Sequence, residues 1–249
     1  MKPHTSYVIF AVQRSGSFLL CEALKNTGLG GVPEEYFLPH EGWENGAWAR
    51  QNGVTSRADF LRLVLEKGTS PNGVFGTKVM WNYFEEMLRN LRELPEYRDL
   101  LGPQIMASLF PNLHYIWIVR RDKVRQAVSW ARAGQTNVYA RVKGASPVTA
   151  TREPVFDFTF IDNLYNLVLE GEAGWQSFFE ASDVQPFKVI YEELVEAYEP
   201  TALAILDYLK VPYPPDLVFG ERRLLKQADA LNDAWAEKYL EMRQTAEHT

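Results

Sequence analysis

Short apolar runs recur along the chain, and each is followed by a segment in which apolar residues return every three or four positions. Four such runs occupy residues 7–12, 74–80, 115–119 and 187–191. They are rich in β-branched and aromatic residues and show no polar alternation, which is typical of strands buried on both faces of a parallel sheet. The pattern therefore predicts four core strands.

The segments between these runs have the apolar spacing of amphipathic helices. Helices are expected over residues 18–26, around 60–65, through 84–91, after Asp122, over about 158–180, over 201–210 starting after Pro200, and at the polar C-terminus. Strands that alternate with helices form a parallel sheet with right-handed crossovers. We therefore predict the α/β class, with one domain over residues 1–249, a central parallel sheet and helices on both of its faces.

Composition narrows the class of protein. Of the 249 residues, 46% are hydrophobic and 23% charged, which excludes a disordered or fibrous chain. A single cysteine excludes an intrachain disulfide and a multi-cysteine zinc site, and it suits a reducing cytoplasm. No run approaches the ~20 apolar residues of a membrane span. The net charge of -6 argues against a general nucleic-acid binder. We expect a cytoplasmic protein without membrane or nucleic-acid partners.

A polar turn, residues 13–17 (Gln-Arg-Ser-Gly-Ser), links the first predicted strand to its helix. Ligands of open α/β sheets bind at the carboxyl ends of the strands, so this turn is a candidate site. Consecutive N–H groups at a helix N-terminus, a glycine that permits close approach and the charge of Arg14 suit a phosphate. The alternative is a solvated turn with a capping serine. The Walker A pattern is absent, which disfavours a nucleoside triphosphatase.

The third predicted strand ends in Arg120 and Arg121, and Ser129 follows two helical turns after Asp122. Residues 112–143 contain seven Lys and Arg residues against one Asp, a net charge of +6, which leaves -12 for the rest of the chain. A charge run of this kind is usually a solvated face. Two arginines at the end of a buried strand favour an anion site.

These motifs together resemble the sulfotransferase superfamily, and they are most similar to its Stf0 branch. The similar stretches are residues 13–17, 31–37, 71–82, 126–130, 191–194 and 226–229. The resemblance runs from near residue 7 to near 235. It implies a P-loop-like sulfotransferase fold and transfer of a sulfuryl group from 3′-phosphoadenosine 5′-phosphosulfate (PAPS), which leaves 3′-phosphoadenosine 5′-phosphate (PAP). This chain departs from the pattern in three places. Arg120-Arg121 stands where the branch often has a single Arg followed by Pro, Phe18 replaces a common Thr, and Lys226 replaces an Arg.

The resemblance also implies roles for individual residues. Binding of PAPS falls to Gln13, Arg14, Ser15, Gly16, Ser17, Phe18, Arg120, Arg121, Ser129 and Lys226. Which of Arg120 and Arg121 binds the 3′-phosphate stays open. Glu35 would take the proton of the acceptor hydroxyl, with Glu34 as a competitor that faces away if the chain is extended. Arg14 would stabilise the leaving 5′-phosphate, and Lys78 is a candidate for contact with the transferring group or the acceptor.

The acceptor implied by the resemblance is a small carbohydrate such as trehalose. Four aromatic residues, Trp43, Trp48, Trp81 and Tyr83, could stack on sugar C–H faces, and we expect Trp43 and Trp81 to bind the acceptor beside Glu35. Aromatic residues in such numbers more often pack in a core or an interface. No His, Asp or Glu cluster has metal-ligand spacing, so no metal is expected. A homodimer is implied. The alternative function is a non-catalytic or phosphoryl-transferring nucleotide-binding protein.

Overall fold

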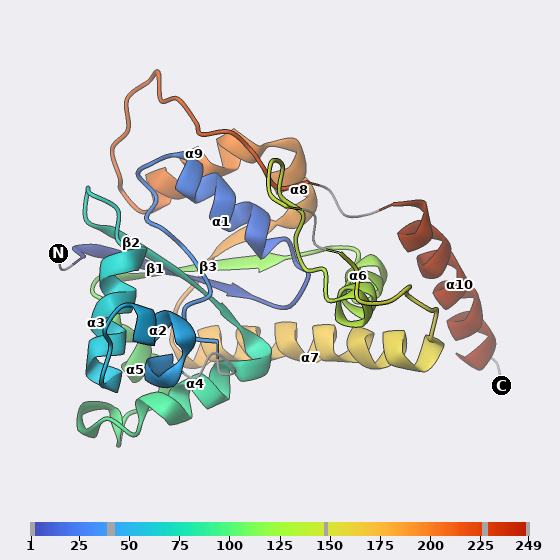
Figure 1. The fold of residues 1–249 in the computed structure, drawn as a ribbon, viewed down its shortest axis with the longest axis horizontal. Coiled ribbons are helices and arrows are strands. Elements are labelled where there is room, and N and C mark those ends of the chain that lie inside the picture. The colour runs from blue at the N-terminus through green and yellow to red at the C-terminus, as the bar shows by residue number, and fades with distance from the viewer. Residues whose placement is uncertain (1–2, 39–42, 147–148, 226–228, 248–249) are drawn as a thin grey trace.

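The four apolar runs form one parallel sheet in the order β2-β1-β3-β4 (Figure 1). β1 (Thr5–Ala11) pairs with β2 (Val74–Met80) and with β3 (Leu113–Val119), and β4 (Phe187–Ile190) pairs with β3. The computed structural model describes residues 3–38, 43–146, 149–225 and 229–247. Every residue of β1 and β2 is buried, as their uninterrupted apolar character predicted. The predicted α/β class with a central parallel sheet is confirmed.

Helices cover both faces of this sheet (Figure 1). One face carries α1 (Ser17–Asn26), α8 (Tyr191–Glu196) and α9 (Tyr198–Tyr208), and the other carries α4 (Phe84–Leu91), α5 (Gly102–Leu109) and α7 (Phe158–Ala181). α2 (Ala47–Gln51) and α3 (Arg57–Gly68) lie near β2, whereas α6 (Lys123–Thr136) and α10 (Ala230–Glu247) lie beyond the carboxyl ends of the strands. Within the described ranges, no helix has the length and apolar character needed to cross a membrane.

The core between the sheet and α7 is aromatic. Trp175 is fully buried, donates a hydrogen bond from Nε1 to the carbonyl of Ala11 at 2.9 Å, and packs against Phe10. Trp81 packs edge-on against Trp175, in space left by Gly174, where a Cβ would lie 2.1 Å from the indole. Trp81 therefore belongs to the sheet–helix packing. The short element after β2 is held against α7 by this contact.

Four helices differ from the sequence-based expectation. α2, α5 and α8 were not predicted, because each has about two turns or fewer, too few for apolar periodicity to stand out. α9 begins at Tyr198, before Pro200, whereas the helix was expected to start after that proline. A proline is tolerated in the first turn because the N–H groups there have no intrahelical partner.

Candidate active site

A cavity of about 670 Å³ opens where β1, β2 and β3 end. Because the strands are parallel and in register, their carboxyl ends meet at one edge, and the residues that follow each strand face a common space. The cavity lining includes Gln13, Arg14, Gly16, Ser17 and Phe18 after β1, Met80 at the end of β2, Asn82 and Tyr83 after it, Arg120, Ser129 and Trp130 after β3, and Glu35 and Leu38. Most of the site residues predicted from sequence are thus brought together.

The turn after β1 forms the centre of the cavity wall. Arg14 and Gly16 both have left-handed backbone conformations, with φ of 62° and 95°, and α1 begins at the next residue, Ser17. Gly16 is required there for a second reason, since a Cβ would lie 2.2 Å from the ring of Tyr191. Ser15 is fully buried, and its Oγ has no hydrogen-bond partner among the described residues. Gly16, Ser17 and Phe18 line the cavity, so the first N–H groups of α1 lie where an anion could bind.

Arg14 and Ser129, which lie in separate motifs of the sequence, are in contact. Arg14 Nε donates to Ser129 Oγ at 3.0 Å, and Nη1 donates to the carbonyl of Tyr139 at 2.6 Å. Burial, and secondarily the positive charge of Arg120, lower the pKa of Arg14 to about 10. The guanidinium is charged at neutral pH, and an anion bound beside it relieves both effects.

The two arginines at the end of β3 point in different directions. Arg120 lines the cavity with its guanidinium 4.9 Å from the ring centroid of Tyr191, and its buried Nε has no hydrogen-bond partner in the described part of the chain. Burial lowers the pKa of Arg120. The Arg121 side chain is 60% exposed and forms an ion pair with Glu193, outside the cavity. Of the two alternatives left open by the sequence, only Arg120 reaches the cavity.

A buried ion pair lies on the β2 side of the cavity. Lys78 is 1% exposed, and its Nζ is 2.7 Å from Oε2 of Glu35. Tyr83 donates a hydrogen bond to the other carboxylate oxygen, Oε1. Burial, together with the negative charge of Glu35, raises the pKa of Tyr83 well above its ordinary value, so the phenol stays a donor.

Glu34, the neighbour that competes with Glu35, faces away from this pair. The backbone of Glu34 forms a parallel bridge with Thr77, so adjacent side chains point to opposite sides. The Glu34 carboxylate forms an ion pair with Lys25 at 2.5 Å, and both side chains are more than one-third exposed. Of the two adjacent acids, only Glu35 lines the cavity.

Besides Arg121, three of the residues predicted for the site lie elsewhere or are not described. Trp43 is 3% exposed and stacks on Phe60, 5.3 Å between ring centroids, so neither it nor Trp81 lines the cavity. Both tryptophans pack in the core, which was the alternative to stacking on a sugar. Lys226 falls outside the described residues.

Other residues reach the cavity that sequence reasoning did not assign to it. They include Asn82, Trp130, Tyr139, Arg141, Tyr191, Arg222, Leu224 and Leu225, and the stacking candidate Tyr83 lines the cavity as well. Arg141 and Leu224 belong to two segments that pair across the cavity, with a bridge between Val142 and Leu224 and a hydrogen bond of 2.8 Å from Lys143 N to Arg223 O. About 80 residues separate these segments in the chain. In the sequence, only the second Arg-Arg pair, at 222–223, indicated that the later segment could bind an anion.

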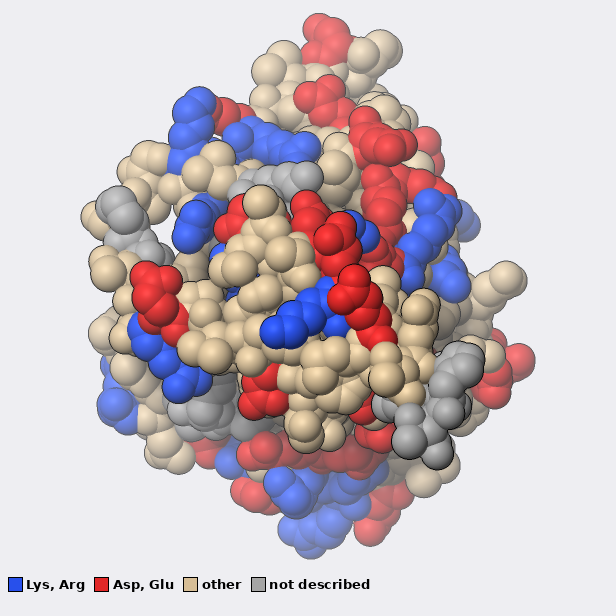
Figure 2. Space-filling view, turned by 90° about the vertical axis from the view of Figure 1, so that its right-hand side faces the viewer, with Lys and Arg blue, Asp and Glu red and all other residues tan. Residues whose placement is uncertain are grey.

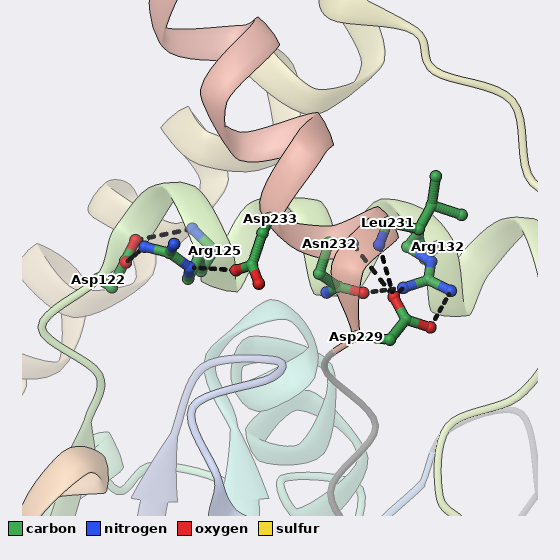
Figure 3. A network of polar contacts seen from close by, with 7 residues as sticks. All are labelled: Asp122, Arg125, Arg132, Asp229, Leu231, Asn232 and Asp233. Carbon is green, nitrogen blue, oxygen red and sulfur yellow. Dashed lines mark hydrogen bonds and ion pairs between the residues drawn. The ribbon is translucent and has the colours of Figure 1, made fainter.

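The +6 segment is largely neutralised in the fold. Five of its seven basic side chains form ion pairs with acids, namely Arg121 with Glu193, Lys123 with Glu172, Arg125 with Asp122 and Asp233, Arg132 with Asp229, and Lys143 with Glu221. Figure 3 shows α10 supplying Asp233, and Asp229 just before it, to α6. Basic and acidic side chains are interspersed on the face seen in Figure 2. Of this segment, Arg120 and Arg141 line the cavity.

The charge of the cavity lining itself is positive. Four arginines, Arg14, Arg120, Arg141 and Arg222, line it against one carboxylate, Glu35, which is paired with Lys78. The described residues contain no group of three or more His, Cys, Asp or Glu side chains able to hold a metal ion. The arrangement suits a ligand with more than one anionic group, held next to a carboxylate that can accept a proton.

Comparisons with known proteins agree with this geometry. The family model described as Stf0 sulphotransferase matches residues 6–242. Trehalose 2-sulfotransferase of Mycolicibacterium smegmatis is 29% identical, with 94% of each chain covered, and that of Mycobacterium tuberculosis is 28% identical, with 94% of this chain and 93% of the relative covered. The sulfotransferase domain of the Synechococcus olefin synthase shares the fold, with a TM-score of 0.51 at 18% identity over 96% of this chain and 88% of that one.

Proposed function

Since this chain belongs to the Stf0 sulphotransferase family, we propose that it transfers a sulfuryl group from PAPS to a hydroxyl of a small, trehalose-like carbohydrate. The observation that carries the proposal is the cavity itself. It joins an anion-binding turn at the start of α1 to the buried pair of Glu35 and Lys78. An anionic donor and a proton acceptor would share one space there, as sulfuryl transfer requires.

The two anionic ends of PAPS fit two parts of the β1 and β3 side. The N–H groups that open α1, with Arg14, would hold the 5′-phosphosulfate, whereas Arg120 and Ser129 would hold the 3′-phosphate. Buried polar groups normally have partners, and here Ser15 Oγ and Arg120 Nε have none among the described residues. Anionic oxygens would satisfy both groups.

The reaction is an in-line displacement at sulfur. The bond between sulfur and the new acceptor oxygen forms as the bond between sulfur and the 5′-phosphate oxygen breaks, and the hydroxyl proton passes to Glu35. Negative charge grows on the leaving phosphate, where Arg14 and the α1 N–H groups stabilise it. Lys78 and Tyr83 each take one hydrogen-bonding position on the Glu35 carboxylate, which leaves others for the acceptor hydroxyl.

Sulfate transfer from PAPS across a panel of sugars that includes trehalose tests this function, with Glu35→Gln and the matched neighbour variant Glu34→Gln. We expect Glu35→Gln to lower kcat about 10²–10⁴-fold, the usual contribution of a general base, while PAP binding persists. The kcat of Glu34→Gln should stay within about twofold of the wild-type value, because the Glu34 carboxylate pairs with Lys25 outside the cavity.

Two results would contradict the proposal. Absence of PAP binding in calorimetry at modest salt would exclude the donor. Equal turnover of Glu35→Gln and wild type would exclude Glu35 as the base. A non-catalytic nucleotide-binding protein would bind PAP without sulfate transfer, and a phosphoryl-transferring one would move phosphate instead. The predicted homodimer is tested separately by the mass of the protein in solution.

A further inference from the structure

Phe18 is an exposed aromatic residue in an otherwise polar turn. It is 40% exposed, lines the cavity, and is the second residue of α1. Lys78 Nζ lies over its ring at 3.6 Å from the centroid, and the same ammonium contacts Glu35. One face of the ring is therefore occupied by Lys78, and the rest is left open beside the proposed base.

Apolar side chains continue from Phe18 along this side of the cavity. Leu38, three residues after Glu35, and Met80, the last residue of β2, both line it. Of the described polar side chains nearby, Tyr83 donates to Glu35 and Asn82 accepts from Gln13 Nε2, while Gln13 Oε1 is buried and has no partner among the described residues. The wall next to the base thus offers apolar contact and few free hydrogen-bonding groups.

The arginines lie on the other side of the turn. In the sheet order β2-β1-β3-β4, Arg120 follows β3, whereas Lys78 and Met80 belong to β2 on the opposite side of β1. Arg14 points toward the β3 side, since its partner Ser129 belongs to α6. An acceptor beside Glu35 therefore meets the apolar wall, while the cationic groups serve the donor.

We propose that the preferred acceptor is a glycoside bearing an alkyl or aryl group, which packs on Phe18, Leu38 and Met80 while a sugar hydroxyl reaches Glu35. This inference rests on the proposed sulfuryl transfer. An unsubstituted disaccharide can turn only small C–H faces to this wall, and the hydroxyls around them would lose their hydrogen bonds to water without replacement. An apolar substituent gains by leaving water at the same place.

The test compares kcat/KM for octyl and phenyl β-glucosides, below their aggregation limits, with that for glucose and trehalose at saturating PAPS. We expect the substituted glucosides to be favoured at least tenfold over glucose and trehalose in the wild type. Phe18→Ala should reduce this preference about tenfold. The control is Phe160→Ala, since Phe160 is 37% exposed on α7 and lies outside the cavity lining.

The ratio of the two substrate classes separates the roles of Phe18. If Phe18 acts only by holding Lys78, Phe18→Ala lowers kcat/KM by the same factor for every acceptor. The ratio of kcat/KM between the two substrate classes then stays constant, and the inference is overturned. Better turnover of trehalose than of either glucoside in the wild type also overturns it, while leaving sulfuryl transfer intact. Calorimetry of octyl glucoside binding to the PAP complex gives a readout independent of turnover. Binding that Phe18→Ala does not weaken would overturn the inference even if no acceptor is sulfated.

Discussion

The two sides of the cavity use charge in different ways. On the β2 side, the ammonium of Lys78 is buried and matched by the carboxylate of Glu35 at 2.7 Å. On the β3 side, Arg14 and Arg120 are partly buried near one another, and the pKa of each is lowered by burial. On the first side a cation is matched by a carboxylate, whereas on the second, among the described residues, no carboxylate lines the cavity.

This difference indicates a division of labour. A balanced pair is rigid and holds a carboxylate in place for one proton transfer. An excess of buried positive charge is costly to the free protein and becomes favourable when an anion arrives. Variants on the β2 side should therefore act on turnover, and variants on the β3 side on donor affinity.

The largest expected effect is on the β2 side. Lys78→Met removes the cation that holds Glu35 and should lower kcat about 10²–10³-fold with PAP affinity unchanged within about twofold. Lys25→Met is the matched control. Because Lys25 pairs with Glu34 at the surface, this substitution should change kcat little. Steady-state sulfate transfer and PAP calorimetry give the two quantities. A loss of PAP affinity as large as the loss of turnover would contradict this division of roles between the β2 and β3 sides.

On the β3 side, Arg120→Met should weaken PAP binding about 10–100-fold, the value of one or two charge-assisted hydrogen bonds. The neighbouring Arg121→Met should change PAP binding less than threefold, since that side chain pairs with Glu193 at the surface. Calorimetry at one fixed salt concentration measures both. Equal losses would show that both arginines reach the ligand.

PAP affinity should depend on pH through Arg14. Its pKa is lowered to about 10 in the free protein, and a bound anion raises it again, so PAP binds the protonated form. Affinity should be level at pH 8–9 and then fall toward tenfold per pH unit above 10, where phosphate no longer titrates. Binding titrations from pH 8 to 10.5 measure the slope. In Arg14→Met the affinity should be low and level; a slope as steep as that of wild type would assign the titration to another group.

The smallest expected effect concerns residues 221–225, which contribute Arg222 to the cavity. Glu22 Oε1 on α1 accepts hydrogen bonds from the backbone N–H groups of Arg223 and Leu224 at 2.8 and 2.9 Å. Glu22→Gln weakens both bonds and should reduce PAP affinity about threefold with kcat nearly unchanged. Glu66→Gln on the exposed surface of α3 is the control. An unchanged affinity would show that this segment needs no anchor on α1.

Much of the fold follows from local pattern. The four strands and the turn at 13–17 were predicted because uninterrupted apolar runs and a Gly-containing turn before a helix act over a few residues. The parallel sheet then placed Arg14, Glu35, Lys78 and Arg120 around one cavity. The positions of Trp43 and Trp81 could not be predicted, since an aromatic ring can either stack on a ligand or pack in the core.

By itself, the sequence determined the class of fold, the positions of charge along the chain and the turn that opens α1. Only the tertiary structure decided which charges remain for a ligand. Five of the seven basic residues in the +6 segment are paired with acids, most of them from α7, α8 or the C-terminal region, while Arg14 and Arg222 join Arg120 and Arg141 from outside it. The physical reason is that an ion pair acts over a few ångströms in space, and distance along the chain does not fix distance in the fold.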